Sequence, residues 1–340
     1  MNVYFTVDTE SSIGGALTRP DRKPLPAPQH VFCRIGKEEH GIPLLVGIMD
    51  RYGFRGTYFV ETLATRCLGD ADTQSIFDFL LSANQDVQLH IHPAFWFLSE
   101  LQAAREKGAP YELPGSPDLI GHFDPQRQMQ LLGEAVRYFE KFAGHLPLAF
   151  RAGCFAGSRS MLRTLKQLGI LVDSSFNPCY HPELSFPDAE LQPNVVQCLE
   201  GVLEVPITVA RTRLPEGYKG LKFADCTSLS FSEIRVMLDE AAAAGQEHFV
   251  VVFHSFSAVK PKDYTFSEMR PNRVVRRRLE RFFRYLAENP DRFRVTTMGD
   301  LARQASSLDS PSSARAIPDL PVAASAMRKA VQLLNNAYWF

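Results

Sequence analysis

The sequence predicts an α/β fold in which a mostly parallel sheet is curled into a barrel-like arrangement. Short apolar runs alternate with segments of helical periodicity along most of the 340 residues. The repeated strand–helix order favours parallel strands, and seven or eight such strands in one domain favour a barrel over an open sheet. In barrels of this kind the chemistry takes place at the carboxyl ends of the strands. Functional residues are therefore expected just after the strands.

Eight segments have the length and apolar content of buried strands: 2–7, 55–60, 87–91, 148–150, 170–172, 202–207, 248–253 and 293–296. Apolar residues at helical spacing predict helices between them: 43–52, 126–142, 160–168, 232–244 and 272–288. Several of these helices are followed by a glycine or a proline that ends them: Gly53, Gly169 and Pro290. Together these elements predict that residues 1–303 form one barrel domain.

Two segments depart from this pattern. Residues 11–42 are rich in proline, glycine and charge, and their length predicts a loop that covers the substrate. Residues 304–325 are dominated by serine, alanine, proline and aspartate, which is typical of a linker. Residues 326–340 then predict an amphipathic C-terminal helix. Three roles are open for this helix: packing on its own domain, docking a partner or a second copy in a homo-oligomer, or lying on a membrane surface.

Charge and cysteine content exclude several classes of function. A formal net charge of -1 gives no electrostatic reason to expect nucleic acid as a partner. The six cysteines are scattered, with no C-x-x-C pair, and indicate reduced thiols rather than disulfides or a cysteine zinc site. No apolar stretch approaches the length of a membrane span, and no signal-peptide pattern opens the sequence. These features favour a cytoplasmic location.

Two carboxylates follow the first predicted strand. Asp8 and Glu10 are two residues apart, so both side chains emerge from the same face of an extended segment. Such a pair is repulsive unless a cation or a proton lies between the two groups. The pattern fits a metal site, but on its own it occurs more often in an exposed turn.

Two histidines lie at the end of the third predicted strand. His90 and His92 share one face, opposite the apolar face of Val87, Leu89 and Ile91. Two imidazoles placed this way can bind one ion, and with a carboxylate they suit zinc or another divalent first-row metal. The alternative is a pair of hydrogen-bonded or surface histidines.

Arg151 and His254 end two further strands. Arg151 can pair with a carboxylate and keep it ionised as a base, although an ordinary salt bridge would explain it too. His254 follows the apolar run 249–253, and its pKa range suits a general acid, although a lone histidine in this position is often structural. In a barrel the ends of all these strands converge on one mouth. Their joint placement is stronger evidence than any single motif.

In this order the motifs resemble those of the polysaccharide deacetylase family, also called the NodB-homology or carbohydrate esterase family 4 group. The resemblance extends through most of residues 1–301. Six short segments carry it: TVDTE at 6–10, GTYFV at 56–60, QLHIHP at 88–93, FRAG at 150–153, DSS at 173–175 and VFH at 252–254.

The resemblance implies a distorted, NodB-like (β/α) barrel of about seven strands. It implies a metal-dependent deacetylase with Asp8 as general base, Arg151 orienting Asp8, and His254 protonating the leaving amine or alcohol. Glu10, His90 and His92 would bind a divalent metal, with zinc the expected ion. The metal would activate water and polarise the acyl carbonyl.

Three departures from the family pattern are present. Thr9 separates Asp8 from Glu10, where the family has adjacent aspartates, so Asp8 is an alternative metal ligand. Only Ile91 separates the two histidines, whereas three residues usually separate them in the family, and Gly153 replaces a proline. These changes indicate a divergent branch, such as enzymes of surface-glycan biosynthesis.

Three functions therefore remain open. The first is removal of an N- or O-acetyl group from a carbohydrate, with a nucleotide- or lipid-linked glycan precursor as the expected substrate. The second is a metal-dependent amidase acting on a non-carbohydrate amide. The third is a catalytically silent barrel that binds a glycan or a partner, although the presence of both Asp8 and His254 disfavours it. The aromatic residues Phe95, Trp96 and Phe97 could stack on a sugar or form a hydrophobic flap.

Overall fold

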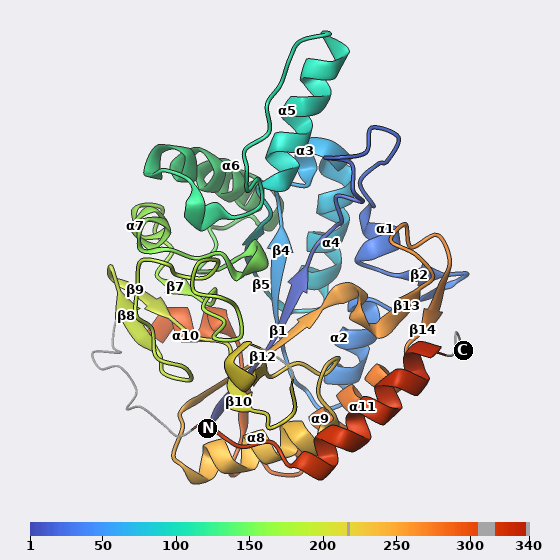
Figure 1. Cartoon of the computed structure of the whole chain (residues 1–340), viewed down its shortest axis with the longest axis vertical. Helices are drawn as coiled ribbons and strands as arrows, with labels where there is room; N and C mark the ends of the chain where they lie inside the picture. The colour runs from blue at the N-terminus through green and yellow to red at the C-terminus, as the bar shows by residue number, and fades with distance from the viewer. Residues whose placement is uncertain (216–217, 305–316, 338–340) are drawn as a thin grey trace.

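The computed structural model describes residues 1–215, 218–304 and 317–337, and a curled sheet of nine strands lies at the centre of these residues (Figure 1). The strand order is β12, β1, β4, β5, β6, β7, β9 and β8, and β15 also pairs with β1. Neighbouring strands are parallel, except that β8 runs antiparallel to β9. Because the strands are parallel, their carboxyl ends lie at one end of the sheet.

The strands of the main sheet are β1 (Asn2–Thr9), β4 (Thr57–Glu61), β5 (Asp86–Ile91), β6 (Ala149–Ala152), β7 (Val172–Asp173), β8 (Gln197–Leu199), β9 (Val202–Glu204), β12 (His248–His254) and β15 (Arg294–Thr296). Small antiparallel pairs lie outside it: β2 (Arg34–Ile35) with β3 (Glu38–Glu39), β10 (Val209–Arg211) with β11 (Leu221–Phe223), and β13 (Val259–Pro261) with β14 (Met269–Pro271).

Single residues bridge the open side of the sheet, between β9 and β12. The chain after β9 reaches Thr208, whose amide donates to the carbonyl of Val250 in β12 at 3.3 Å and whose hydroxyl accepts the amide of Val250 at 2.8 Å. Ala224 then links Thr208 to Val252 through backbone hydrogen bonds of 2.8 and 2.9 Å. The barrel is thus closed by bridging residues on this side, which is why it is distorted.

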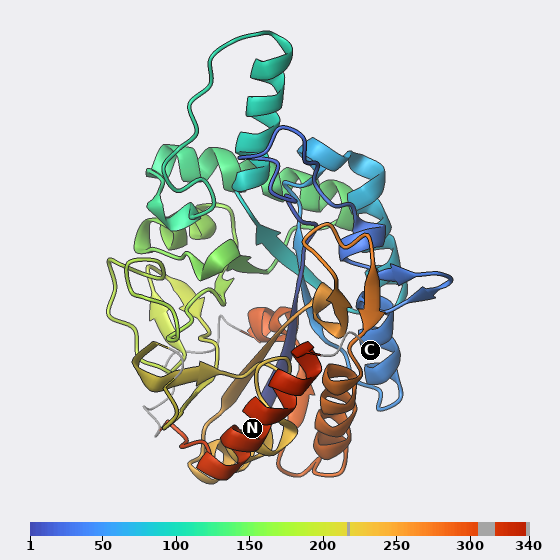
Figure 2. The same ribbon diagram turned by 45° about the vertical axis from the view of Figure 1, so that its right-hand side comes forward.

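Helices cover the outside of the sheet in both views (Figures 1 and 2). Sequence signals define their ends: the Asp124 side chain accepts the Arg127 amide at the start of α6, and Gly144 ends this helix with a left-handed φ of 75°. The helices are α1 (Ala27–His30), α2 (Ile42–Asp50), α3 (Thr65–Leu68), α4 (Asp70–Ser82), α5 (Ala94–Glu106), α6 (Pro125–Ala143), α7 (Arg159–Gln167), α8 (Phe231–Ala243), α9 (Arg273–Ala287), α10 (Met298–Gln304) and α11 (Val322–Ala337).

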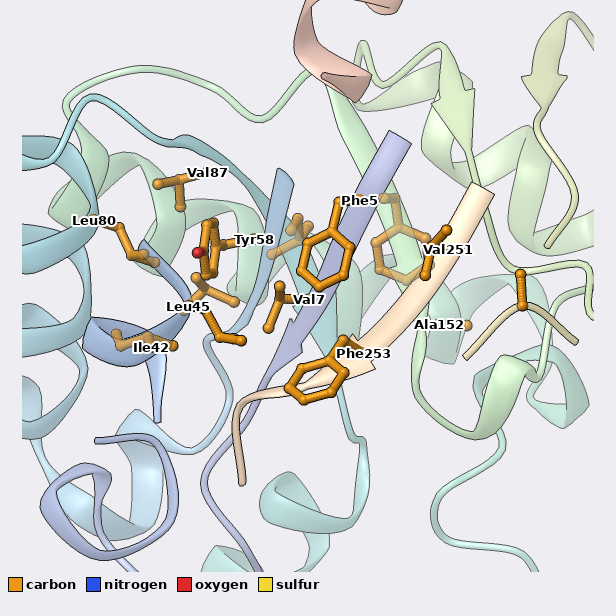
Figure 3. Close-up of a cluster of buried hydrophobic side chains, with 14 of the residues drawn as sticks. Phe5, Val7, Ile42, Leu45, Tyr58, Leu80, Val87, Ala152, Val251 and Phe253 are labelled. Carbon is orange, nitrogen blue, oxygen red and sulfur yellow. The ribbon is translucent and has the colours of Figure 1, made fainter. Parts of the chain in front are cut away.

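The largest apolar core lies between the sheet and these outer helices (Figure 3). Phe5 of β1 is fully buried, with its ring centroid 6.0 Å from that of Phe253 in β12 and 4.8 Å from that of Phe283 in α9. Successive side chains of a strand point to opposite faces, so Thr6 and Asp8 of β1 point into the barrel instead. This alternation delivers the polar residues of the strands to the barrel interior.

The structure confirms the fold class predicted from the sequence. Each predicted strand has a counterpart in the main sheet. The elements that were not predicted include β8, the small antiparallel strand pairs and the helices α1, α3, α4, α5 and α10. The predicted covering loop, 11–42, contains α1 and the β2–β3 pair. Among the described residues, no helix combines the length and the apolar composition needed to cross a bilayer.

The C-terminal helix α11 begins at Val322 rather than at residue 326. Residues 305–316 of the predicted linker and residues 338–340 of the predicted helix lie outside the described residues. The end of the predicted linker is packed on the barrel, because Arg211 exchanges backbone hydrogen bonds with Pro318 and Leu320 at 2.7 and 2.8 Å. The sequence pattern therefore located this helix but not its first turn.

Candidate metal centre

Sheet register brings the predicted site residues to neighbouring strand ends. Asp8, at the end of β1, is paired with His254, the last residue of β12. His90, near the end of β5, is paired with Arg151 in β6. Glu10 follows β1 by one residue. All six residues predicted from the sequence therefore belong to the carboxyl end of the barrel.

Glu10, His90 and His92 form one cluster of potential metal ligands. The Oε2 atom of Glu10 lies 2.5 Å from Nε2 of His92 and 3.5 Å from Nε2 of His90. One potential ligand atom from each of the three residues lies within 4.8 Å of the other two. Asp8 is engaged differently, because its Oδ1 atom is held by Arg151. The geometry therefore places Glu10, rather than Asp8, with the two histidines.

The second nitrogen of each imidazole is already occupied. Nδ1 of His90 lies 2.8 Å from the carbonyl oxygen of Arg151, and Nδ1 of His92 lies 2.8 Å from Oδ2 of Asp118. Both acceptors favour a proton on Nδ1, so Nε2, which faces Glu10, is the atom that each ring can offer to an ion. One carboxylate and two Nε2 atoms are a donor set suited to a divalent first-row metal. The residues present therefore fit such an ion.

The electrostatics of the cluster also favour a cation. Burial acts to raise the pKa of Glu10, but the neighbouring His92 and His90 outweigh it and hold this pKa well below its usual range. Burial acts to lower the pKa of His92, but the carboxylates of Asp118 and Glu10 outweigh it and hold this pKa well above its usual range. Positive charge is thus stabilised at the centre of the cluster.

Arg151 fixes the position of Asp8. The guanidinium is fully buried, and its Nη1 atom donates to Oδ1 of Asp8 at 2.7 Å and to the hydroxyl of Thr6 at 2.8 Å. Its Nε and Nη2 atoms donate to the carbonyl and hydroxyl oxygens of Ser174 at 2.9 and 3.0 Å. Asp8 is therefore held by a charge-assisted hydrogen bond that leaves its Oδ2 atom available.

His254 lies at the mouth of the site. Its Nε2 atom is 3.9 Å from Oδ2 of Asp8 and 4.0 Å from Oε1 of Glu10, and its side chain is 33% exposed. Asp8 is nearly buried by comparison, with a side-chain exposure of 4%. His254 is therefore the member of this group that can both face the two carboxylates and meet a molecule arriving from solvent.

Comparison with solved structures identifies the fold. No protein-family model matches the sequence, and no curated protein sequence matches it. A protein described as a polysaccharide deacetylase, from Mycobacterium smegmatis, is 18% identical with a TM-score of 0.52, and the match covers 93% of this chain and 94% of that chain. This chain has the polysaccharide deacetylase fold. Also similar are a protein described as a polysaccharide deacetylase from Pseudomonas aeruginosa PAO1 (13% identity, TM-score 0.48) and an allantoinase (12% identity, TM-score 0.48), each covering 91% of both chains.

Asp118 is a residue of the candidate site that the sequence did not reveal. It lies between α5 and α6, and besides holding His92 it accepts the amide of Ala94 through Oδ1 at 3.2 Å. Cys154 completes this group, with its sulfur 3.6 Å from Oδ2 of Asp118. No pattern near residue 118 indicated this position, because only the path of the chain between the two helices brings it to His92.

A buried pair of carboxyl groups lies behind Arg151. Asp173 and Glu204 are paired across β7 and β9, and both are fully buried. Burial, together with their mutual repulsion, raises the pKa of Glu204 well above its usual range, and burial also raises that of Asp173. Asp173 Oδ2 and Glu204 Oε2 find no donor among the described residues. One shared proton between these two oxygens would satisfy both.

The pocket beside the cluster is small. A cavity of about 220 Å³ is lined by Glu10, His92 and Asp118 together with the rings of His30, Phe95 and Phe256, among others. Phe95 is thus the one of the three aromatic residues after His92 that lines this cavity. Trp96 instead donates to Glu100 at 2.6 Å and stacks with Arg66, and Phe97 is buried. Neither Trp96 nor Phe97 supplies a stacking surface to this cavity.

Proposed function

We propose that the protein is a metal-dependent hydrolase that removes an N- or O-acetyl group from a carbohydrate, with a surface-glycan precursor as its substrate. The observation that carries the proposal is the convergence of Glu10, His90 and His92 at one end of the barrel, beside Asp8 and His254. A binding protein has no need for a carboxylate held by arginine next to a free imidazole. A hydrolase needs both groups.

Glu10, His90 and His92 would hold the divalent ion, which we propose to be zinc. Bound there, the ion would supply Lewis-acid chemistry, polarising the acyl carbonyl and lowering the pKa of water. His90 and His92 are kept in the ligating orientation by the carbonyl of Arg151 and the carboxylate of Asp118. These contacts support the proposal, because they would hold the donor atoms in place before an ion binds.

Asp8 acts as the general base in this proposal. Arg151 holds Oδ1, so Oδ2 is the atom that accepts a proton from the attacking water. The water oxygen forms a bond to the acyl carbon, and the bond from this carbon to the sugar nitrogen or oxygen breaks. His254 donates its Nε2 proton to the leaving nitrogen or oxygen, which releases acetate and the free amine or alcohol. Asp8 then passes its proton to His254, which returns both side chains to their starting states.

The small pocket supports a short acyl group. Its volume of about 220 Å³ and its lining by Phe95 and Phe256 suit an acetyl group with the sugar ring at the mouth. The cavity bears on the acyl group alone and leaves the identity of the sugar to experiment.

The test combines metal analysis with a substrate panel. The protein is stripped of metal, reloaded with zinc, and assayed for acetate release from N- and O-acetylated sugars and from small non-carbohydrate amides. We expect acetate release from sugars that depends on the reloaded ion. Release from the small amides alone would assign an amidase instead. A zinc-loaded, folded protein that acts on neither class would make it a catalytically silent barrel.

A further inference from the structure

Helix α11 (Val322–Ala337) exposes its apolar side to solvent. Met327, Leu333 and Leu334 are 68%, 71% and 59% exposed, the highest values among the exposed large apolar side chains of the described residues. Their spacing of six and seven residues places them on one side of the helix, together with the small residues Ala326 and Ala330. An amphipathic helix of a globular protein normally turns this side toward the core.

A buried ion pair holds α11 in this orientation. Arg328 is nearly buried, and its Nε atom donates to Oε1 of Glu233 in α8 at 3.1 Å. The buried hydroxyl of Ser325 donates to the same oxygen at 2.7 Å. Toward the other end of α11, Lys260 donates to the carbonyl of Asn335 at 2.5 Å. Rotating the helix to bury its leucines would leave the charge of Glu233 unpaired, so the exposed side is the one the fold presents.

A row of arginines on α9 borders this apolar side. Arg273, Arg277, Arg281 and Arg284 are exposed and recur at the helical spacing that puts them on one face of α9. Figure 2 shows α11, in red, lying beside α9. Arg277 and Arg281 line the same groove of about 320 Å³ as Met327 and Val331 of α11. The residues of α11 include no aspartate or glutamate that would offset this positive charge.

We propose that the surface formed by Arg273, Arg277, Arg281 and Arg284 of α9 and by Met327, Leu333 and Leu334 of α11, the α9–α11 surface, binds an anionic membrane. An anionic bilayer accepts both kinds of residue, because the apolar side chains enter the interface while the arginines meet lipid phosphates. A second copy related by two-fold symmetry would bring the same arginine row near itself. A nucleic acid would neutralise the arginines but leave the leucines in water.

The test uses the full-length protein and lipid vesicles. Co-sedimentation is measured with vesicles of phosphatidylcholine alone and of phosphatidylcholine mixed with phosphatidylserine. We expect binding to the mixed vesicles that weakens as salt is added. The double substitution Leu333→Ser with Leu334→Ser should abolish it. Arg277→Gln with Arg281→Gln should weaken it by about 25-fold, since each basic residue contributes about five-fold at such a surface.

Matched substitutions elsewhere on the protein distinguish binding through the α9–α11 surface from nonspecific binding to vesicles. Leu146→Ser with Leu171→Ser removes two exposed leucines outside the α9–α11 surface, and Arg105→Gln with Arg137→Gln removes the same charge. Both controls should bind like wild type, with circular dichroism showing that every variant is folded. The proposal is overturned if the folded wild-type protein does not bind anionic vesicles, or if the control variants lose as much binding as the α9–α11 variants. It is also overturned if wild type is a dimer that Leu333→Ser with Leu334→Ser separates. None of these outcomes depends on catalytic activity.

Discussion

Nδ1 of His92 lies 2.8 Å from Oδ2 of Asp118, and this contact sets the orientation of one of the two imidazoles in the ligand cluster. A carboxylate that accepts the Nδ1 proton fixes the ring so that the opposite nitrogen, Nε2, is the one that can bind an ion. The corresponding contact of His90 is to a backbone carbonyl, that of Arg151. A side-chain substitution can therefore test the His92 contact directly, whereas the His90 contact belongs to the main chain.

Asp118→Ala should weaken metal binding without unfolding the protein. Without the Nδ1 acceptor, the His92 ring can rotate and its proton can move to Nε2. Losing such a partner typically costs roughly 10- to 100-fold in metal affinity, and we expect a loss of that size here. Asp118→Asn should cost less, because its amide oxygen can still accept the proton. Competition with a chelator measures the affinity. Glu112→Gln, an exposed site between the same two helices, should leave it unchanged, and an equal loss in that control would contradict the role of Asp118.

Substitutions in the site should separate metal binding from catalysis. We expect Asp8→Asn and His254→Ala to abolish turnover while the protein still binds its ion, because neither side chain belongs to the ligand cluster. His90→Ala or His92→Ala should leave the protein without metal. Elemental analysis beside the acetate-release assay measures both properties. If Asp8→Asn lost the ion and Glu10→Gln kept it, the roles of base and ligand would be exchanged.

The strand-end residues were predictable because their placement depends on local patterns. Alternation of apolar and polar residues in β5 placed His90 and His92 on one side, and the parallel order of strands placed Asp8 beside His254. Asp118 was not predictable, because its position depends on how the chain between α5 and α6 returns over the end of β5.

The orientation of α11 shows a different limit of sequence reasoning. Periodicity predicted a helix there, but it does not say which side faces the domain. The pairing of Arg328 with Glu233 decides this, and these residues are 95 positions apart. A polar contact between distant residues thus overrides the usual preference for burying the apolar side. The helices α4 and α5 were also not predicted, and no contact of theirs explains why.

Arg151 should be essential for stability as well as for the position of Asp8. Arg151→Met would leave the nearly buried carboxylate of Asp8 without its counterion, and losing one partner of a buried ion pair costs about 3–5 kcal/mol. Asp8→Asn in the same protein should recover part of this loss, since it removes the unpaired charge. Urea unfolding of the two single variants and the double variant gives the coupling. Strictly additive effects would show that the two side chains do not depend on each other.

The Asp173–Glu204 pair should make stability fall as pH rises. In the unfolded chain Glu204 loses its proton near its ordinary pKa of about 4.3. In the folded protein burial raises this pKa well above that value, so the proton is retained. Between the two pKa values the unfolded state releases a proton that the folded state keeps, and the free energy of unfolding decreases with pH until the folded pKa is passed. The stabilising contribution is therefore complete only below the unfolded pKa.

Glu204→Gln should remove this dependence. The glutamine amide can donate permanently to Oδ2 of Asp173, as the shared proton does, while its oxygen still accepts the amide of Phe176, which lies 2.9 Å from Oε1 of Glu204. Urea unfolding from acidic to alkaline pH should show that the free energy of unfolding of the variant increases relative to that of wild type as pH rises. The exposed control Glu112→Gln should track wild type throughout. A difference in unfolding free energy between wild type and Glu204→Gln that stays constant across this range would contradict the prediction. It would mean that Glu204 is ionised in the folded protein, with Arg151 as the counterion of the Asp173–Glu204 pair.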